Sequence, residues 1–481
     1  MMISREYVLG LAVPVGILGF SLLYLSRRDK PKTGIDSPTQ DGHRPRIADL
    51  RDPSIRANHI EFNKHLIAQY PEVDAIELSD QLAGNRVFLV HKHQRVLDVI
   101  RDIETFTSNP WPTKRPLVTL NTMDKNDHDR IYRLIKSFYT RSAVESMEEV
   151  IANIIEEHGR KLLEDGDVYR FSKRLHMHLS LITSGVCSDA TFDCPLIDEF
   201  INYNDIAVRI TAPLGGVGNE FEYTWKRVYN LAVGLWNSLR GTFGLIRRIG
   251  IQSTWALLTP SEALLPSPPY THIWDYPEDL PVIVRYFNRL YDCMSLSSST
   301  SPVGALFSHI GTDVSAAEAI GTAVQLMVNM TTANAIQSFL FRRCFNKDVS
   351  PDMILFSDAP LQRNPRRAIR NGRIGSVIIP KGSLIILMIG AANLDCPAGA
   401  QSMTFGFGLH HCLGRHLVTL EMMKVDEWLT NIQRSFDMEL DGSPIRLTDV
   451  DVGNWGFVRL VIRFVRKNRN VSEDGLHTPL H

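Results

Sequence analysis

The sequence predicts a mainly helical protein that is preceded by one transmembrane helix. Apolar residues recur at intervals of three and four over long stretches, as in residues 144–164, a pattern typical of amphipathic helices. Residues 7–25 contain no charged side chain, so this segment can lie in a membrane. The chain has 481 residues, enough for two or three average domains, or for one large domain if a cofactor organises the core.

The uncharged segment at residues 7–25 is long enough to span a bilayer, because a helix of this length covers roughly 28 Å. Four basic residues follow it: Arg27, Arg28, Lys30 and Lys32. The positive-inside rule therefore predicts a lumenal end at residues 1–6 and a cytosolic domain. A cleaved signal peptide is the alternative, but its apolar region would be shorter and would end in small residues. Residues 26–48 are predicted to be a basic, proline-containing tether.

Charge and cysteine content narrow the class of protein. The net charge of −1 gives no indication of a nucleic-acid partner. Six cysteines are scattered without the spacing of a disulfide framework, which suits a reducing compartment. We expect residues 49–466 to form one domain and residues 467–481 to form a flexible tail.

The helical periodicity is clearest in two segments. In residues 144–164 the predicted buried face consists of Met147, Val150, Ile151, Ile154, Ile155 and Leu162. A second amphipathic helix begins after Gly414, with Leu417, Leu420, Val425, Trp428 and Ile432 on its apolar face. Three charged residues fall mostly off that face: Glu421, Lys424 and Glu427.

Cys412 precedes this second helix, in a run from Phe405 to Arg415 that reads FGFGLHHCLGR. Gly408 and Gly414 carry no side chain, so the backbone around the cysteine can lie flat against a planar ring. The nearby helix N-terminus favours thiolate over thiol. The loop therefore suits a thiolate that binds the iron of a haem, a ligand that promotes O–O cleavage.

Two other interpretations of Cys412 were weighed. A single cysteine is most often a small buried apolar residue. Here the spacing Phe-x-x-Gly-x-x-x-Cys-x-Gly fixes four residues, which argues against a chance match. A zinc site is the other alternative, because His410, His411 and His416 lie close in sequence. These ligands are adjacent rather than separated by the usual loop, which argues against zinc.

The run around Cys412 resembles the haem-binding signature of the cytochrome P450 superfamily, in the form closest to its bacterial-type branch. Further segments resemble the family in the same order: Arg86–Asp98, Phe106–Ser108, Met123–Thr140, Pro360–Arg366, Ile379–Gly382 and Gly390–Asn393. The resemblance covers roughly residues 85–465 and is weak in the middle third. It implies a mainly α fold with small β-sheets. Residues 258–281, rich in proline, correspond to the substrate lid of the family or form an ordinary surface loop.

The resemblance also implies a set of site residues around haem b. Cys412 corresponds to the axial ligand of the iron, within a loop that includes Phe405, Gly408 and Gly414. Residues that match the positions holding the haem propionates are His128, Arg366 and His410. On the oxygen-binding helix, Thr331 matches the proton-delivering threonine, with Asn329 as a polar substitute for the acid.

This sequence departs from the family in several places. Met330 and Val328 stand where the family has an acid and a glycine. The family's Glu/Arg pair falls on Met353 and Phe356, and Tyr132 replaces an arginine that binds a propionate. The segments from Thr331 to Pro360 and from Asp395 to Phe405 are each about a dozen residues shorter than in the family.

Three functions follow as hypotheses. The first is a monooxygenase of the endoplasmic reticulum membrane that takes electrons from NADPH through a cytochrome P450 reductase type of donor. Its substrate is expected to be a hydrophobic small molecule of specialised metabolism. The second is a haem-thiolate peroxygenase or isomerase that does not activate dioxygen. The third is a degenerate, non-catalytic membrane-anchored homologue, which includes the case of an incomplete gene model.

Overall fold

The computed structural model describes residues 59–79, 85–109, 119–123, 125–187, 194–211, 220–258, 280–328, 331–446 and 456–467. The predicted transmembrane segment at residues 7–25 and the tether at 26–48 lie outside the described residues. Asn329 and Met330 also lie outside the described residues, as does the predicted tail apart from Lys467. Within the described ranges, no helix combines the length and the apolar character needed to cross a membrane.

A five-stranded sheet forms one layer of the molecule, with the strand order β1-β2-β7-β4-β3. Its strands are β1 (Ile76–Glu77), β2 (Val87–Val90), β3 (Phe106–Thr107), β4 (Arg363–Ala368) and β7 (Leu384–Met388). β2 pairs with β7 in parallel, and the other pairs are antiparallel.

All four residues of β2 are buried, because helices cover both faces of the sheet. Phe88 and Val90 pack with α5 (His93–Arg101) on one face. Val87 and Leu89 pack with α4 (His59–Gln69) on the other, next to α17 (Ile389–Leu394).

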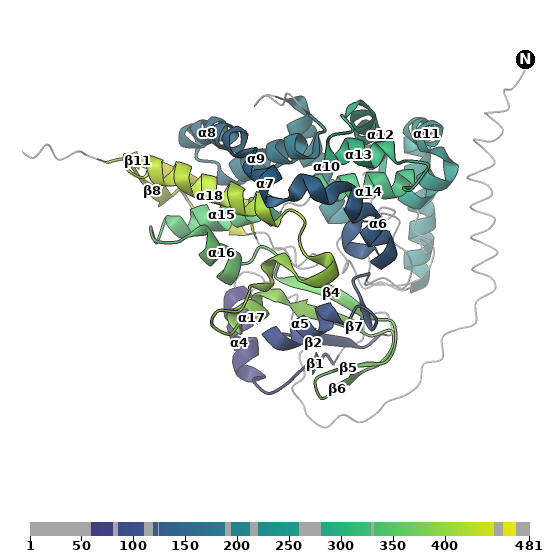
Figure 1. Ribbon diagram of the computed structural model, residues 1–481, viewed down its shortest axis with the longest axis horizontal. Helices are drawn as coiled ribbons and strands as arrows, with labels where there is room; N and C mark the ends of the chain where they lie inside the picture. The colour runs from purple at the N-terminus through teal and green to yellow at the C-terminus, as the bar shows by residue number, and fades with distance from the viewer. Residues whose placement is uncertain are drawn as a thin grey trace, which may run out of the picture.

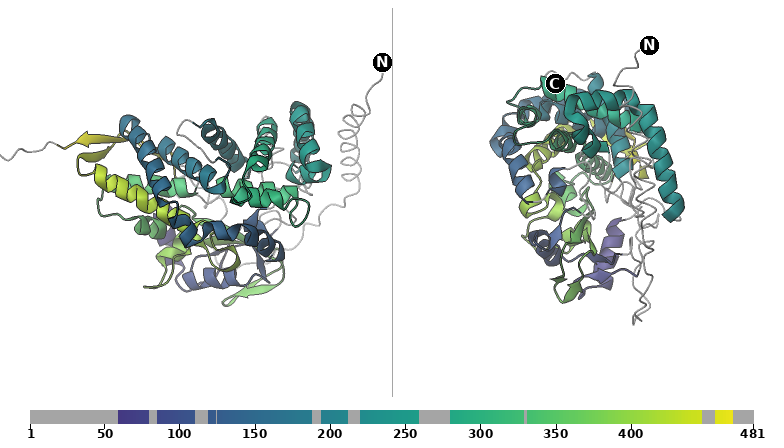
Figure 2. Two further views of the ribbon diagram at one scale, coloured as in Figure 1. Left: turned by 45° about the horizontal axis from the view of Figure 1, so that its top comes forward. Right: turned by 90° about the vertical axis from the view of Figure 1, so that its right-hand side faces the viewer.

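A layer of helices lies beside this sheet (Figure 1). It contains α6 (Lys125–Ile135), α7 (Arg141–Glu145), α8 (Glu148–Asp165), α9 (Val168–Ser184), α10 (Pro195–Thr211), α11 (Glu220–Leu258), α12 (Leu280–Leu296), α13 (Pro302–Ser308), α14 (Ala316–Val328), α15 (Thr331–Arg343), α16 (Pro351–Ser357) and α18 (Arg415–Ile432). Figures 1 and 2 show α8 and α18 at one end of this layer and α11 and α12 at the other.

Short strands and 3₁₀ turns complete the described structure: β5 (Gly372–Ile374), β6 (Val377–Ile379), β8 (Phe436–Leu440), β9 (Ile445–Arg446), β10 (Phe457–Arg459), β11 (Ile462–Arg466), η1 (Leu120–Thr122), η2 (Lys136–Tyr139), η4 (Met403–Phe405) and η5 (Gly408–His410). The strands pair in twos, β5 with β6, β8 with β11 and β9 with β10. The architecture is mainly helical with small sheets, as predicted.

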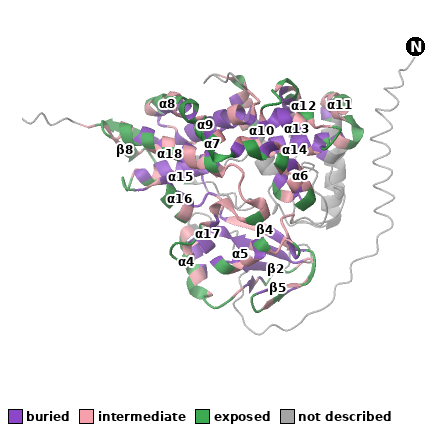
Figure 3. Cartoon of the chain, viewed as in Figure 1, coloured by how far each residue is buried: buried purple, intermediate pink, exposed green. Residues whose placement is uncertain are grey.

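Helix α9 lies between the two large apolar clusters of the helical layer (Figure 3). Met177 packs in the cluster that contains Tyr286 of α12, whereas Phe171 packs in the cluster that contains Trp428 of α18. Because both sides of α9 are covered, its polar residues are buried as well, including His176, His178 and Ser180.

The predicted amphipathic helices are present, with two corrections. Residues 144–164 form parts of α7 and α8, and Val150 is exposed rather than buried because the apolar face of α8 is centred on Ile151 and Ile155. In α18, Glu421 is fully buried although its charge predicted a position off the apolar face. Its partner comes from α9, as described below.

Candidate functional site

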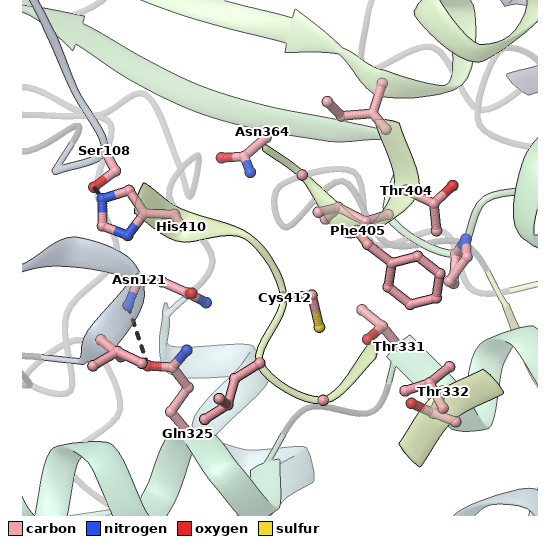
Figure 4. A pocket seen from close by; sticks show the side chains of 18 of the residues that line it. Ser108, Asn121, Gln325, Thr331, Thr332, Asn364, Thr404, Phe405, His410 and Cys412 are labelled. Atoms are coloured by element: carbon pink, nitrogen blue, oxygen red, sulfur yellow. Dashed lines mark hydrogen bonds between the residues drawn. The ribbon is translucent and has the colours of Figure 1, made fainter. Parts of the chain in front are cut away.

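A cavity of about 440 Å³ lies between the sheet and the helical layer. Its wall is formed by the loop that carries Cys412, by the chain leading into β4, and by α9, α14 and α15. The Cys412 side chain is directed into this space (Figure 4). The volume is in the range typical of pockets for small molecules.

The backbone of the cysteine loop leaves one side of the loop open. Gly406 and Gly408 have φ values of 64° and 65°, a conformation that favours glycine. A Cβ atom added to Gly408 or Gly414 would meet no atom within 4 Å. The Cys412 N–H donates to the Phe405 carbonyl at 2.8 Å, and the guanidinium of Arg415 lies over the Phe405 ring. The loop is thus fixed in shape, and Gly408 and Gly414 face open space.

Cys412 lies just before the N-terminus of α18, where Gly414 is the N-cap. Burial raises the pKa of the Cys412 thiol, whereas a hydrogen bond from the Gly414 backbone and the charge of Arg415 lower it. The thiolate is therefore the disfavoured form of the uncoordinated side chain, and a bound cation would deprotonate it.

A buried positive charge faces the same cavity. The Arg366 guanidinium is buried, and it donates to the Asn364 side chain at 2.6 Å and to the Pro365 carbonyl at 2.9 Å. Among the described residues it forms no ion pair with a carboxylate. Burial lowers the pKa of Arg366 to about 10, so the guanidinium remains charged at neutral pH. A buried charge is costly unless it is paired, so this position fits an anionic ligand.

His410 lies beside Arg366 and is neutral. Its Nε2 is 2.8 Å from the Ser108 hydroxyl. Its Nδ1 lies near the Leu120 backbone but forms no well-aligned hydrogen bond in the described structure. Burial and then the charge of Arg366 lower the pKa of His410 to about 3. A neutral ring with an unsatisfied nitrogen can donate to a carboxylate of a ligand.

His128 is close to this corner but does not line the cavity. Its ring meets the His410 ring edge-on at a centroid distance of 5.1 Å and stacks on Tyr132 at 5.3 Å. Burial lowers the pKa of His128. His128 therefore supports His410 from behind, and Tyr132 supports His128 in turn.

Thr331 at the start of α15 lines the cavity, as does its neighbour Thr332. Asn329, its predicted partner, lies outside the described residues. Thr322 of α14 is fully buried at the cavity wall, and its hydroxyl has no partner in the described structure.

Helix α9 contributes a row of polar residues that was not predicted from the sequence. His176, Ser180 and Thr183 all line the cavity. The Ser180 hydroxyl lies 3.5 Å from His176 Nε2, and His176 Nδ1 lies 3.4 Å from a carboxylate oxygen of the buried Glu421. Their spacing of four and three places the residues on one helix face, a signal that the sequence contained.

The support of the cysteine loop also differs from what the resemblance implies. Met353 is exposed on α16 and Phe356 is partly buried, and no described ion pair joins α16 to the loop. Instead Asn393 of α17, which is fully buried, accepts from the Met403 N–H at 2.7 Å and donates to the Thr404 hydroxyl at 3.0 Å. Thr404 donates to the Leu355 carbonyl of α16. A neutral network therefore holds the start of the loop.

Comparison with curated proteins gives short, distant matches, and no family model matches the chain. Cytochrome P450 133B2 of Xylella fastidiosa, whose name is marked as provisional, is 26% identical over 170 residues, which cover 29% of this chain and 42% of that protein. The related cytochrome P450 133B1 is 32% identical over 78 residues, which cover 14% of this chain and 19% of that protein. The chain thus spans less than half the length of the curated relatives it matches.

Solved structures match over most of the chain. CYP164A2 of Mycobacterium smegmatis, free of ligand, has a TM-score of 0.56 at 18% identity, covering 86% of this chain and 98% of its own. CYP109E1 of Bacillus megaterium with testosterone has a TM-score of 0.59 at 16% identity, and the match covers 85% of this chain and 99% of that one. A mutant of P450 EryK with erythromycin B has a TM-score of 0.61 at 15% identity, and the match covers 86% of this chain and 98% of that one. The chain thus has the fold of the cytochromes P450, and part of its sequence is similar to curated proteins of that superfamily.

Proposed function

We propose that the protein is a haem-thiolate monooxygenase that inserts one atom of dioxygen into a small molecule. One observation carries the proposal: the sulfur of Cys412 faces the same cavity as the buried guanidinium of Arg366, which has no carboxylate partner among the described residues. These two groups match the two chemical ends of haem b, its iron and its carboxylates. When bound, the haem supplies the activation and cleavage of dioxygen, which a thiolate ligand favours.

Toward a bound haem, the residues of the chain would have the following roles. Cys412 would hold the haem iron through its sulfur, and Phe405, Gly408 and Gly414 would shape the loop around it. Arg366 and His410 would bind the propionates, and Ser108 would orient the His410 ring through the contact with Nε2. Thr331 would hold a proton on its hydroxyl at the cavity wall.

Electrons would come from NADPH through a reductase. The substrate would be a hydrophobic small molecule of specialised metabolism, since two structural neighbours are described with erythromycin B and testosterone. The anchor at residues 7–25 would hold the domain on the cytosolic side of the endoplasmic reticulum. Deleting residues 1–48 should release the protein from membranes in a flotation assay, and continued flotation of the deletion variant would reject the anchor.

Two measurements test the enzymatic proposal. The reduced protein, exposed to carbon monoxide, should show the Soret band of a thiolate-bound haem. If this band is absent, the protein is the degenerate homologue, and the enzymatic proposals fail together. The holoprotein with reductase, NADPH and oxygen should then convert small apolar probes such as testosterone.

A peroxide-driven enzyme is the second candidate, and one observation favours it. No Asp or Glu is present among the described residues that line the cavity, so an acid for proton delivery is missing there. Product formed with hydrogen peroxide, together with none formed with reductase, NADPH and oxygen, would select this candidate over the monooxygenase.

A further inference from the structure

Two cysteines that are seven positions apart in the sequence meet in the structure. Cys187 follows the C-terminus of α9, Cys194 precedes α10, and their sulfur atoms lie 4.0 Å apart. All six cysteines of the chain lie in its described part, and all are thiols. Both residues of this pair are partly buried rather than enclosed in the core.

Backbone hydrogen bonds hold both ends of the pair. Gly185 ends α9 in the left-handed conformation, and the Cys187 N–H donates to the Leu181 carbonyl at 3.2 Å. The Cys194 carbonyl accepts from the Ile197 N–H at 3.0 Å, in the first turn of α10. An ion pair between Arg174 of α9 and Asp198 of α10 joins the same two helices. The pair is therefore preorganised, and the sulfurs need to approach by only about 2 Å to reach the length of a disulfide bond.

The remaining cysteines are less suited to oxidation. Cys293 of α12 is buried near Cys187, and burial raises the pKa of its thiol, which keeps it protonated. Burial also raises the pKa of Cys344, to about 12, and that of Cys396. A metal site is disfavoured, because no group of three or more ligand side chains is placed for one in the described residues.

We propose that Cys187 and Cys194 form a disulfide bond when the protein meets a low-molecular-weight disulfide such as oxidised glutathione. One cysteine thiolate attacks the glutathione disulfide, releases one glutathione and forms a mixed disulfide. The other cysteine then attacks the sulfur of the first and releases the second glutathione. Two protein thiols are oxidised by two electrons, one glutathione disulfide is reduced, and the two thiol protons pass to the two glutathiones. The new bond ties the end of α9 to the start of α10.

The test is to incubate the full-length protein with oxidised glutathione and to alkylate it under denaturing conditions. Four alkylated cysteines are expected instead of six. Trypsin leaves both residues in one peptide, 175–209, because no Lys or Arg separates them; cleavage before Asp189 or Asp193 is therefore needed to identify the link. Oxidation should also raise the melting temperature by roughly 2 °C, because closing a short loop restricts the unfolded chain.

Matched variants decide the outcome. Cys187→Ser and Cys194→Ser should each abolish the linked peptide and the rise in melting temperature, whereas Cys396→Ser should leave both unchanged. Glutathione adducts on the separate cysteines without a 187–194 link would overturn the proposal, as would a link from Cys187 to Cys293. None of these readouts depends on haem or on turnover.

Discussion

Two regions of the molecule contain histidines with buried ring nitrogens but differ in how their polar atoms are satisfied. Between α8 and α9, His158 Nε2 and His178 Nδ1 meet at 2.9 Å, so the two rings satisfy each other. At the cavity, Arg366 has no carboxylate partner in the described structure, and His410 Nδ1 makes no acceptable hydrogen bond there. Buried polar groups in proteins are normally paired within the fold. The comparison therefore separates groups that stabilise the fold from groups that are placed for a ligand.

The largest effect is expected from Cys412→Ser, which tests whether the residues at the cavity bind a ligand without stabilising the fold. The variant should lose the thiolate-type carbon monoxide band entirely and keep the melting temperature of the haem-free protein within about 1 °C, since serine differs from cysteine by one atom in a side chain that faces the cavity. Cys396→Ser is the control. A thiolate band that survives in Cys412→Ser would show that another residue binds the iron.

Arg366→Met should weaken haem binding by about tenfold or more, because charge-assisted hydrogen bonds to a ligand carboxylate are lost. The same substitution should raise the melting temperature of the haem-free protein, because an unpaired buried charge is removed. Haem titration and thermal unfolding measure the two effects. Arg370→Met, at an exposed arginine near the end of the same strand, should change neither. If Arg366→Met destabilised the haem-free protein, the guanidinium would belong with the groups that stabilise the fold.

Asn393→Ala tests the neutral network that holds the cysteine loop. Loss of its hydrogen bonds to Met403 and Thr404 should lower the free energy of unfolding by about 2 kcal/mol, because the Met403 N–H stays buried without a partner. We also expect part of the thiolate-type band to convert to the thiol type. Asn371→Ala removes an exposed hydrogen bond to the Lys381 N–H and serves as the control. An unchanged spectrum in a destabilised Asn393→Ala would limit Asn393 to a role in folding.

The histidine pair between α8 and α9 should make stability depend on pH. Burial, and then the charges of His178 and Arg174, lower the pKa of His158 to about 3. In the unfolded chain this histidine titrates near 6.5, so between these values the unfolded state binds a proton that the folded state does not. Stability should therefore fall as the pH drops below about 6.5, by up to about 1.4 kcal/mol per pH unit from this residue. His158→Gln should reduce that slope in urea unfolding between pH 7 and pH 5, and an unchanged slope would contradict the assignment.

Local features of the site could be predicted from the sequence, because short-range rules govern them. The glycines around Cys412, and the start of a helix right after it, depend on backbone conformation and capping alone. The burial of Glu421 could not be predicted, because its partner His176 lies 245 positions away. The cysteines are scattered in the sequence, whereas the folding of α9 and α10 brings Cys187 and Cys194 together. The edge-on contact between the rings of His128 and His410 depends on tertiary packing and could not be predicted from the sequence either.

The central sheet joins segments from near both ends of the described chain, so it can be completed only late in translation. β2 pairs in parallel with β7, and beside them the buried Asn63 side chain donates to Gln362, 299 positions later. During translation, the apolar strand β2 is complete long before its partner leaves the ribosome. Until then its backbone groups lack their sheet partners, so the nascent chain has an open strand edge for most of its elongation. Nascent chains that end before residue 384 should therefore require a chaperone to remain unaggregated, and haem can be enclosed only after the last part of the sheet is made.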